Sequence, residues 1–363
     1  MGETETVDSM GETETVGISV VNGGPTLGGF SREQLVELLS QMLLYRRFEE
    51  KAEESYAIGK IGGFCHLHIG QEGAAAGCIL PLRRDDYVIS SYRSHTQALA
   101  KGLSPEAVMA ELFGKASGAS GGIGGSMHMF GADLGFMGGN GIVGAQAPLA
   151  LGMAWAIHYR GGDQVCLCFL GDAAVNQGGF HESMNMAAIW NLPVIYVIEN
   201  NAYGMGTKFT RMSDTQMVKK AASHGVPATV IDGEDVMATY AHFEGLIESV
   251  RKGAGPQFVD VECYRFKGHS MSDPVSGTYR SKEEVEDRTE NADPICILRD
   301  RMFAAELLTG EELEAIDREA RSTVDAAVEF AEAAPEPEVD TLYRNVYSEI
   351  NPHGRLFFDG RGK

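Results

Sequence analysis

The chain has 363 residues, of which 44% are hydrophobic, and its formal net charge is −21 at pH 7. This length allows one large domain or two moderate ones. The large negative charge argues against a nucleic-acid partner, because a polyanion repels an acidic protein. The sequence contains no uncharged apolar run of about 18 residues, so we expect no membrane-spanning helix.

The first 30 residues are rich in Gly, Glu and Thr, and they contain MGETETV twice, at 1–7 and 11–17. We interpret residues 1–30 as a disordered acidic arm. They lack the basic start and apolar core of a secretory signal and the Arg-rich composition of a mitochondrial transit peptide, so a cytoplasmic location is expected. Six cysteines without a CxxC motif indicate reduced thiols.

A helix is predicted to begin at Ser31. Gln34, three residues later, completes a capping box, and five apolar residues follow at helical spacing: Leu35, Leu38, Leu39, Met42 and Leu43. Further along, four segments have the composition of strands: 86–90, 165–170, 194–199 and 258–266. The second and third are almost wholly apolar, which is typical of parallel strands buried on both faces.

Helices are predicted between and after these strands. Residues 179–190 form the crossover of a βαβ unit, and the small-residue segment 141–160 predicts another helix. After Asp293-Pro294 the pattern changes to amphipathic helices. We therefore predict an α/β fold over 31–290, with a central, mainly parallel sheet flanked by helices, and a helical C-terminal extension over 291–363.

Polar residues follow each of the four predicted strands. In open parallel sheets, ligands bind beyond the carboxyl ends of the strands. We therefore expect one rim of the sheet to gather Tyr92, Arg93, His95, Asp172, Asn200, Asn201, Tyr203, Lys267, His269, Ser270 and Asp273.

The chemistry of this rim favours a diphosphate bridged by a metal ion. Asp172 and Asn201 offer oxygen ligands, and a turn carbonyl near Tyr203 offers a third. Mg²⁺ accepts such a small protein set when phosphates and water complete its octahedron. Arg93 has the planar fork that binds phosphate, and His269 adds a donor. Backbone N–H groups after Asp172, at the start of a helix predicted over 174–190, can bind a further phosphate oxygen.

Gly171-Asp172, followed after one helix and one strand by Asn200-Asn201, is similar to the motif of thiamine diphosphate enzymes that is usually written GDG…NN. Longer segments extend the likeness over about residues 31–345, among them GFCHLHIGQEGAAAG, SYRSHTQALAKG, GGNGIVGAQAPLALGMAWA and RFKGHSMSDP. On these segments the chain resembles the α subunits of thiamine diphosphate-dependent 2-oxo acid dehydrogenases, and most closely those of the pyruvate dehydrogenase type.

The resemblance implies roles at the matching positions. Mg²⁺ would be bound by the side chains of Asp172 and Asn201 and by the carbonyl of Tyr203. The diphosphate would be held by Tyr92, Arg93, His269 and the backbone at Ala173 and Ala174. The aminopyrimidine ring would contact the backbone of Gly141 and Val143, and the catalytic histidines would be His66, His95 and His269.

The resemblance also implies the reaction, an oxidative decarboxylation of pyruvate that uses thiamine diphosphate and Mg²⁺. The cofactor acts as the electron sink, and the acetyl group passes to a lipoyl arm of an acyltransferase core. The carboxylate that activates the cofactor would come from a β subunit in an α2β2 heterotetramer, because no residue of this chain is assigned to it. Glu199 is expected to support Asn201.

Three alternatives stay open. Acetoin or a branched-chain 2-oxo acid could replace pyruvate, although the segment KGHSMSDP favours pyruvate. The chain could be a catalytically silent assembly paralogue, since Ala173 stands where the motif has its second Gly. A positive φ there would strain Ala by roughly 1–2 kcal/mol, but the start of a helix has negative φ, so we predict that Ala173 is tolerated. The third alternative is a simple phosphate-binding domain.

The segment 267–281 is rich in Gly, Ser and Asp and has no apolar periodicity. We predict that it is a mobile loop. It is expected to order over the diphosphate when the cofactor binds.

Overall fold

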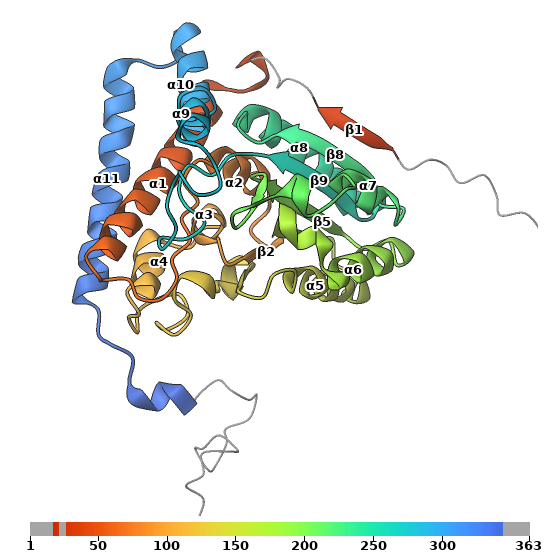
Figure 1. The fold of residues 1–363 in the computed structure, drawn as a ribbon, viewed down its shortest axis with the longest axis horizontal. Helices are drawn as coiled ribbons and strands as arrows, with labels where there is room; N and C mark the ends of the chain where they lie inside the picture. Colours follow the sequence, from red (N-terminus) through yellow and green to blue (C-terminus); the bar gives the residue numbers. More distant parts are fainter. Residues whose placement is uncertain (1–16, 22–26, 344–363) are drawn as a thin grey trace, which may run out of the picture.

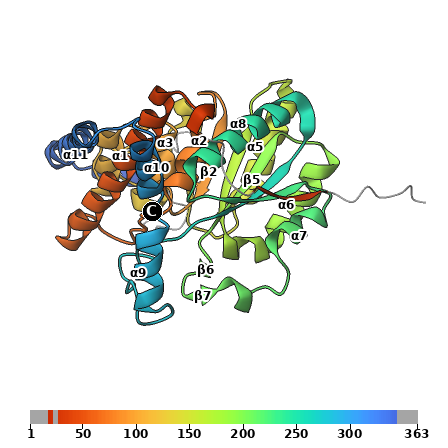
Figure 2. The same cartoon turned by 90° about the horizontal axis from the view of Figure 1, so that it is seen from above.

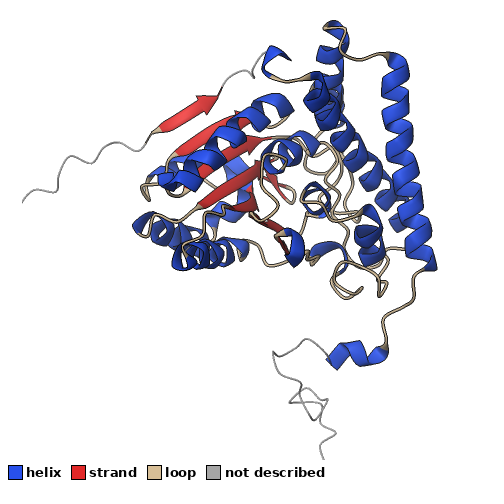
Figure 3. Cartoon of the chain, turned by 180° about the vertical axis from the view of Figure 1, so that it is seen from behind, coloured by secondary structure: helices blue, strands red, loops and turns tan. Residues whose placement is uncertain are grey.

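The computed structural model describes residues 17–21 and 27–343. Its centre is a seven-stranded sheet in the order β1-β8-β9-β5-β4-β2-β3, and every pairing in it is parallel. The strands are β1 (Ile18–Val21), β2 (Tyr87–Ser91), β3 (Phe136–Asn140), β4 (Cys166–Gly171), β5 (Val194–Asn200), β8 (Ala228–Asp232) and β9 (Gln257–Glu262). Figure 3 shows these strands between layers of helices, so the predicted α/β fold is confirmed.

The two central strands are buried on both faces, as their apolar sequences predict. In β4, Cys166 and Cys168 face one core, while Leu167 and Phe169 face the other. Strand β5 alternates between the same two cores. This burial fixes the register of β4 against β5, because a slip by one residue would exchange the two faces.

Helices cover both faces of the sheet. One core is closed by α5 (Gln146–Arg160), α6 (Gly178–Ile189) and α7 (Met217–Ala222). The other core contains residues of α1 (Arg32–Ala57), α2 (Glu72–Ile79), α3 (His95–Ala100), α4 (Pro105–Leu112) and α8 (Val236–Ser249). In Figure 1, α5 and α6 lie below the strands and α8 lies above them.

Helix α1 begins as predicted. Ser31 is its N-cap and forms the capping box with Gln34, and the five predicted apolar residues are buried. The C-terminal helices α10 (Pro294–Ala304) and α11 (Gly310–Ala333) pack beside α1 (Figure 1). Val324 and Ala327 of α11 belong to the same core as α1. The described part of 291–343 therefore extends the main core, and residues 344–363 lie outside the described residues.

The structure corrects the predicted arm at 1–30. Ile18–Val21 forms an edge strand that pairs with β8, and Ser19 Oγ lies 2.9 Å from Thr229 Oγ1. The alternation of apolar and polar residues at 18–20 suits an edge strand, so the prediction of disorder was wrong there. Residues 1–16 and 22–26 lie outside the described residues.

Other boundaries differ from the predictions. Strand β9 ends at Glu262 and not at Phe266, because the chain leaves the sheet and Phe266 N–H donates to Ile69 O. Helix α5 starts at Gln146, five residues after the predicted start. The helix predicted over 174–190 is two helices, a 3₁₀ turn η4 (Asp172–Asn176) and α6. Gln177, with ψ 141°, separates them.

Strands β3 and β8 were not predicted, nor was a two-stranded hairpin of β6 (Tyr203–Gly204) and β7 (Thr207–Lys208). The hairpin lies beside α9 (Lys282–Asn291) in Figure 2, where the Tyr203 hydroxyl donates to Glu284. None of the helices in the described ranges has the length and apolar character that a bilayer span requires.

Candidate active site

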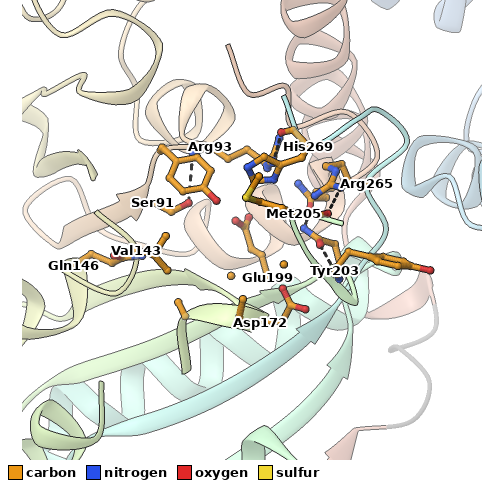
Figure 4. Close-up of a pocket in the computed structure, with 17 residues that line it drawn as sticks. Ser91, Arg93, Val143, Gln146, Asp172, Glu199, Tyr203, Met205, Arg265 and His269 are labelled. Atoms are coloured by element: carbon orange, nitrogen blue, oxygen red, sulfur yellow. Dashed lines mark hydrogen bonds between the residues drawn. The ribbon is translucent and has the colours of Figure 1, made fainter. Parts of the chain in front are cut away.

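A cavity of about 250 Å³ opens beyond the carboxyl ends of β2, β4 and β5 (Figure 4). It is lined by Gln71, Ser91, Tyr92, Arg93, Val143, Gln146, Gly171, Asp172, Ala173, Ala174, Glu199, Asn201, Tyr203, Gly204, Met205, Arg265 and His269. The structure therefore brings together residues that follow all four of the strands predicted from the sequence. Strand ends of a parallel sheet meet at one edge, and this is where such sheets bind ligands.

Asp172 stands directly after β4. Its side chain is buried, at 2% exposed, and its Oδ2 atom has no hydrogen-bond donor among the described residues. Burial raises the pKa of this carboxyl from 3.8 to about 6. Backbone N–H groups of Asp172 and Ala173 bond to this carboxyl, but a buried carboxylate oxygen without a partner is costly unless a cation reaches it, so Asp172 fits the expected role of a metal ligand.

Asn201 lies on the turn between β5 and β6, and Tyr203 is the first residue of β6. The Tyr203 N–H donates to Asn201 Oδ1 at 3.3 Å, and the Asn201 amide donates to Gln71 Oε1 at 2.9 Å. The Ala202 N–H donates to the Asn200 side chain. These side-chain turns hold Ala202 at a positive φ of 67° and set the course of the backbone at Tyr203.

The described residues hold no group of three His, Cys, Asp or Glu side chains placed to bind a metal. One carboxylate, one amide and one carbonyl form a weak set by themselves. Such a set fits Mg²⁺, which binds through one or two carboxylates together with substrate phosphates.

Two buried arginines face the cavity without a carboxylate partner in the described chain. Arg93, 5% exposed, donates to the carbonyls of Leu67 and His269. Arg265, 2% exposed, donates to the carbonyl of Lys267 and to the Tyr279 hydroxyl. Burial, and then the nearby Arg265, lower the pKa of Arg93 to about 10. Buried cations of this kind are stabilised by an anion, and their planar forks suit phosphate.

His66, Tyr92 and His269 form a cluster of rings, with centroids 4.5 to 5.7 Å apart. Burial, followed by the Arg93 charge, lowers the pKa of His66 to about 2 and that of His269 to about 4. Both rings are therefore neutral at physiological pH. The Nδ1 atom of each ring is buried and has no partner in the described chain. His269 lines the cavity, whereas His66, whose ring contacts that of His269, does not.

His95 is placed differently from the expectation. It is fully buried and does not line the cavity, because Glu49 and Ser126 hold its two ring nitrogens at 2.9 and 2.8 Å. Glu199 does line the cavity. Its Oε1 atom is held by His68 and Gln97, at 2.8 and 2.7 Å. The described bonds of Glu199 therefore do not include the expected one to Asn201.

At the other end of the cavity, Val143 lines the wall and is 42% exposed. Gly141 does not reach the cavity wall. It lies against the ring of His128, which an added Cβ at Gly141 would meet at 3.1 Å. Of the two residues expected to contact the aminopyrimidine ring, Val143 therefore lines the cavity and Gly141 does not.

Sequence reasoning missed Arg265, Gln71 and Gln146 among the lining residues. Arg265 was hidden because it lay inside the strand predicted over 258–266. A signal was present nonetheless, since an arginine within a segment expected to be buried requires a partner. Gln71 and Gln146 carried no recognisable signal.

The loop 267–281 is held by the chain itself. The guanidinium of Arg280 donates to the carbonyls of Val275, Arg265 and Lys267. Ser270 Oγ donates to Asp273 at 2.9 Å. These bonds give the loop a defined path beside the cavity, and its ordering by a cofactor stays a prediction.

The fold is thus a parallel α/β sheet whose cavity, with Asp172, Arg93 and Arg265 in its wall, lies at the strand ends where sheets of this class bind ligands. The profile of the family described as "Dehydrogenase E1 component" matches residues 40–340. The chain belongs to this family.

Individual relatives agree with the family. A protein of Rhizobium meliloti (strain 1021) named "Pyruvate dehydrogenase E1 component subunit alpha" is 48% identical over 324 residues, which is 89% of this chain and 92% of that protein. A Zymomonas mobilis protein of the same name is 47% identical over 317 residues, which is 87% of this chain and 89% of that protein. The human testis-specific mitochondrial form is 41% identical over 326 residues, which is 90% of this chain and 83% of that protein.

Proposed function

We propose that this chain is the α subunit of a pyruvate dehydrogenase decarboxylase component and that it binds thiamine diphosphate with Mg²⁺. Asp172, Asn201 and the Tyr203 carbonyl would bind the metal ion. Arg93, Arg265, His269 and the backbone at Ala173 and Ala174 would bind the diphosphate. When bound, the cofactor supplies the electron sink for loss of CO₂ from a 2-oxo acid.

The observation that carries this proposal is the charge arrangement of the cavity. Arg93 and Arg265 are buried without carboxylate partners, and the Asp172 oxygen is buried without a donor. In Figure 4, Arg93, Arg265 and His269 lie on one side of the cavity and Asp172 on the other. A diphosphate with its metal ion complements both sides, because its oxygens pair with the arginines and its cation pairs with Asp172.

We propose further that the active unit contains a β subunit. The carboxylates that line the cavity are Asp172 and Glu199. The first is needed by the metal, and the second is held by His68 and Gln97. A partner would therefore supply the carboxylate that activates the cofactor. Helices α5 and α6, which pack against each other, and the C-cap residue of α6 expose large apolar side chains that suit a subunit contact: Leu149, Trp155, Tyr159, Ile189 and Trp190.

The proposed substrate is pyruvate, and the proposed acceptor is a lipoyl arm of the acyltransferase core. The names of the relatives support pyruvate over acetoin or a branched-chain 2-oxo acid. Ala173 gives no support to a silent paralogue. The described non-glycine residues with positive φ are Asn191, Ala202, Met205 and Glu306. Ala173 therefore has no positive φ, as predicted, and its tolerance in the cofactor site stays a prediction. A cytoplasmic location stays a prediction.

The proposal is tested by titrating thiamine diphosphate into the complex co-expressed with its β subunit, in Mg²⁺, by calorimetry. Asp172→Ala should abolish measurable binding while the far-UV circular dichroism stays unchanged, because the side chain lies beyond the sheet. Asp133→Ala is the matched control, since Asp133 is exposed, and it should bind like the parent. Parent-like affinity of the Asp172→Ala complex would refute the site.

A further inference from the structure

Ala173 and Gly204 approach each other at the cavity wall. Ala173 follows Asp172 on η4, and Gly204 follows Tyr203 on β6. A Cβ atom built on Gly204 would lie 2.6 Å from the Ala173 Cβ. It would also lie 3.0 and 3.1 Å from the Cε and Sδ of Met212. The methyl of Ala173 therefore occupies the space in front of the Gly204 Cα.

The backbone conformation does not explain the glycine at 204. Positive φ values occur at its neighbours Ala202 (67°) and Met205 (54°), both of which carry side chains, whereas Gly204 has no positive φ. Where φ is ordinary, a glycine can instead be required because another group approaches too closely for a side chain to fit. Here that space is taken chiefly by Ala173.

We propose that the Ala173 methyl is a spacer that sets the separation between two loops, one carrying Asp172 and the other carrying Asn201 and Tyr203. This inference rests on the proposed function, in which both loops bind one metal ion. Ala173 is thus a positioning residue: its backbone lines the diphosphate site, and its side chain acts on the opposite loop.

The spacing matters because the two loops would share one small ion. Mg²⁺ requires ligands at about 2.0–2.1 Å in near-octahedral geometry, whereas Ca²⁺ accepts about 2.3–2.6 Å. A second methyl between the loops would overpack them and move them apart. That movement penalises Mg²⁺ more than Ca²⁺, which a general loss of stability would not do.

Three variants of the co-expressed complex test the spacer: Ala173→Gly, Gly204→Ala and the double variant. Dissociation constants for thiamine diphosphate are measured in Mg²⁺ and in Ca²⁺. Gly204→Ala should raise the constant in Mg²⁺ more than about tenfold, and it should raise it less in Ca²⁺. Ala173→Gly removes the spacer and leaves the loops free to approach each other, so it should also raise the constant in Mg²⁺, but by less than Gly204→Ala does. The double variant moves the methyl from one loop to the other, so it should recover parent-like affinity and metal preference.

Gly245→Ala is the matched control, because Gly245 is exposed on α8 with no atom within 4 Å of an added Cβ. It should bind like the parent. A double variant as weak as Gly204→Ala, or an equal loss in both metals, would overturn the inference.

Unfolding midpoints of the cofactor-free complexes separate this inference from the proposed function. Gly204→Ala should lower the midpoint, and Ala173→Gly should restore it in the double variant, whether or not the cofactor binds. A parent that binds no thiamine diphosphate would refute the proposed function alone. A double variant with a midpoint no higher than that of Gly204→Ala would refute the contact.

Discussion

Asp260 shows how a single carboxyl can influence the stability of this fold. It lies on β9, is 7% exposed, and its Oδ1 atom has no partner in the described chain. Burial, reinforced by Glu262 and Asp172, raises its pKa from 3.8 to about 7, although a hydrogen bond from Asn200 opposes the shift. The folded protein therefore holds a proton on Asp260 at pH values where the unfolded chain has released it.

The sign of the pH dependence follows from this shift. Between about pH 4 and 7 the unfolded state binds fewer protons, so the free energy of unfolding falls as the pH rises. Asp260→Asn removes this loss. The variant should be more stable than the parent above pH 7, by at most roughly 4 kcal/mol for a pKa raised from 3.8 to about 7. The difference should shrink toward about pH 4.

Urea unfolding of the cofactor-free protein at about pH 5 and pH 8 measures this effect. Asp163→Asn serves as the control of opposite sign. Asp163 is exposed, and its hydrogen bond with Arg83 lowers its pKa to about 2. That variant should gain no stability at either pH. A parent and an Asp260→Asn variant with equal midpoints at pH 8 would contradict the account of Asp260.

At this scale, sequence reasoning identified residues whose chemistry is visible without coordinates. Asp172 and Arg93 are polar residues directly beyond apolar strands, and the structure places both at the cavity. His95 belonged to the same pattern, yet Glu49 and Ser126 enclose it. These partners lie 46 and 31 residues away in sequence, so local pattern could not indicate them.

The loop 267–281 is the element in which an added negative charge would act most directly on the cavity. Ser270 is 7% exposed, and its hydroxyl donates to Asp273. A carboxylate at 270 would face the Asp273 carboxylate at short range, and it would also repel the diphosphate. Ser270→Glu should therefore loosen the turn and weaken thiamine diphosphate binding by more than about tenfold.

Calorimetric titration of three loop variants checks this prediction. Ser272→Glu places the same charge on an exposed residue of the same loop, and it should have a smaller effect. Ser270→Ala removes the hydroxyl without adding charge, and it should stay within about tenfold of the parent. Parent-like affinity of Ser270→Glu would show that the loop does not lie where we describe it.

Elements differed in how well the sequence predicted them. Strands β4 and β5 were predicted because strands buried on both faces have almost wholly apolar sequences. Helix α1 was predicted because the two residues of its capping box, Ser31 and Gln34, are close in sequence. Strand β3 was missed because its sequence, FMGGN, contains two glycines and lacks the usual β-branched residues. Strand β1 was missed because its partner among the described strands, β8, lies 210 residues later in the chain.

The whole chain combines a cavity suited to a cofactor with features that point to a partner. Its parallel sheet, two cores and C-terminal helices follow from apolar patterning, so the fold class was predictable. The assembly was not predictable from that patterning, because the apolar side chains exposed on α5 and α6 resemble ordinary helix positions in a sequence. We therefore expect the isolated chain to bind thiamine diphosphate weakly and to lack turnover.

The central claim is that this chain oxidises pyruvate only as part of a complex that holds thiamine diphosphate. Pyruvate-dependent reduction of an artificial electron acceptor tests it most directly, with the chain alone, the β subunit alone and the co-expressed complex compared in Mg²⁺. We predict turnover by the complex alone, loss of turnover without thiamine diphosphate, and faster turnover of pyruvate than of acetoin or a branched-chain 2-oxo acid. Robust turnover by the isolated chain, or none by the complex with any of these substrates, would contradict the account.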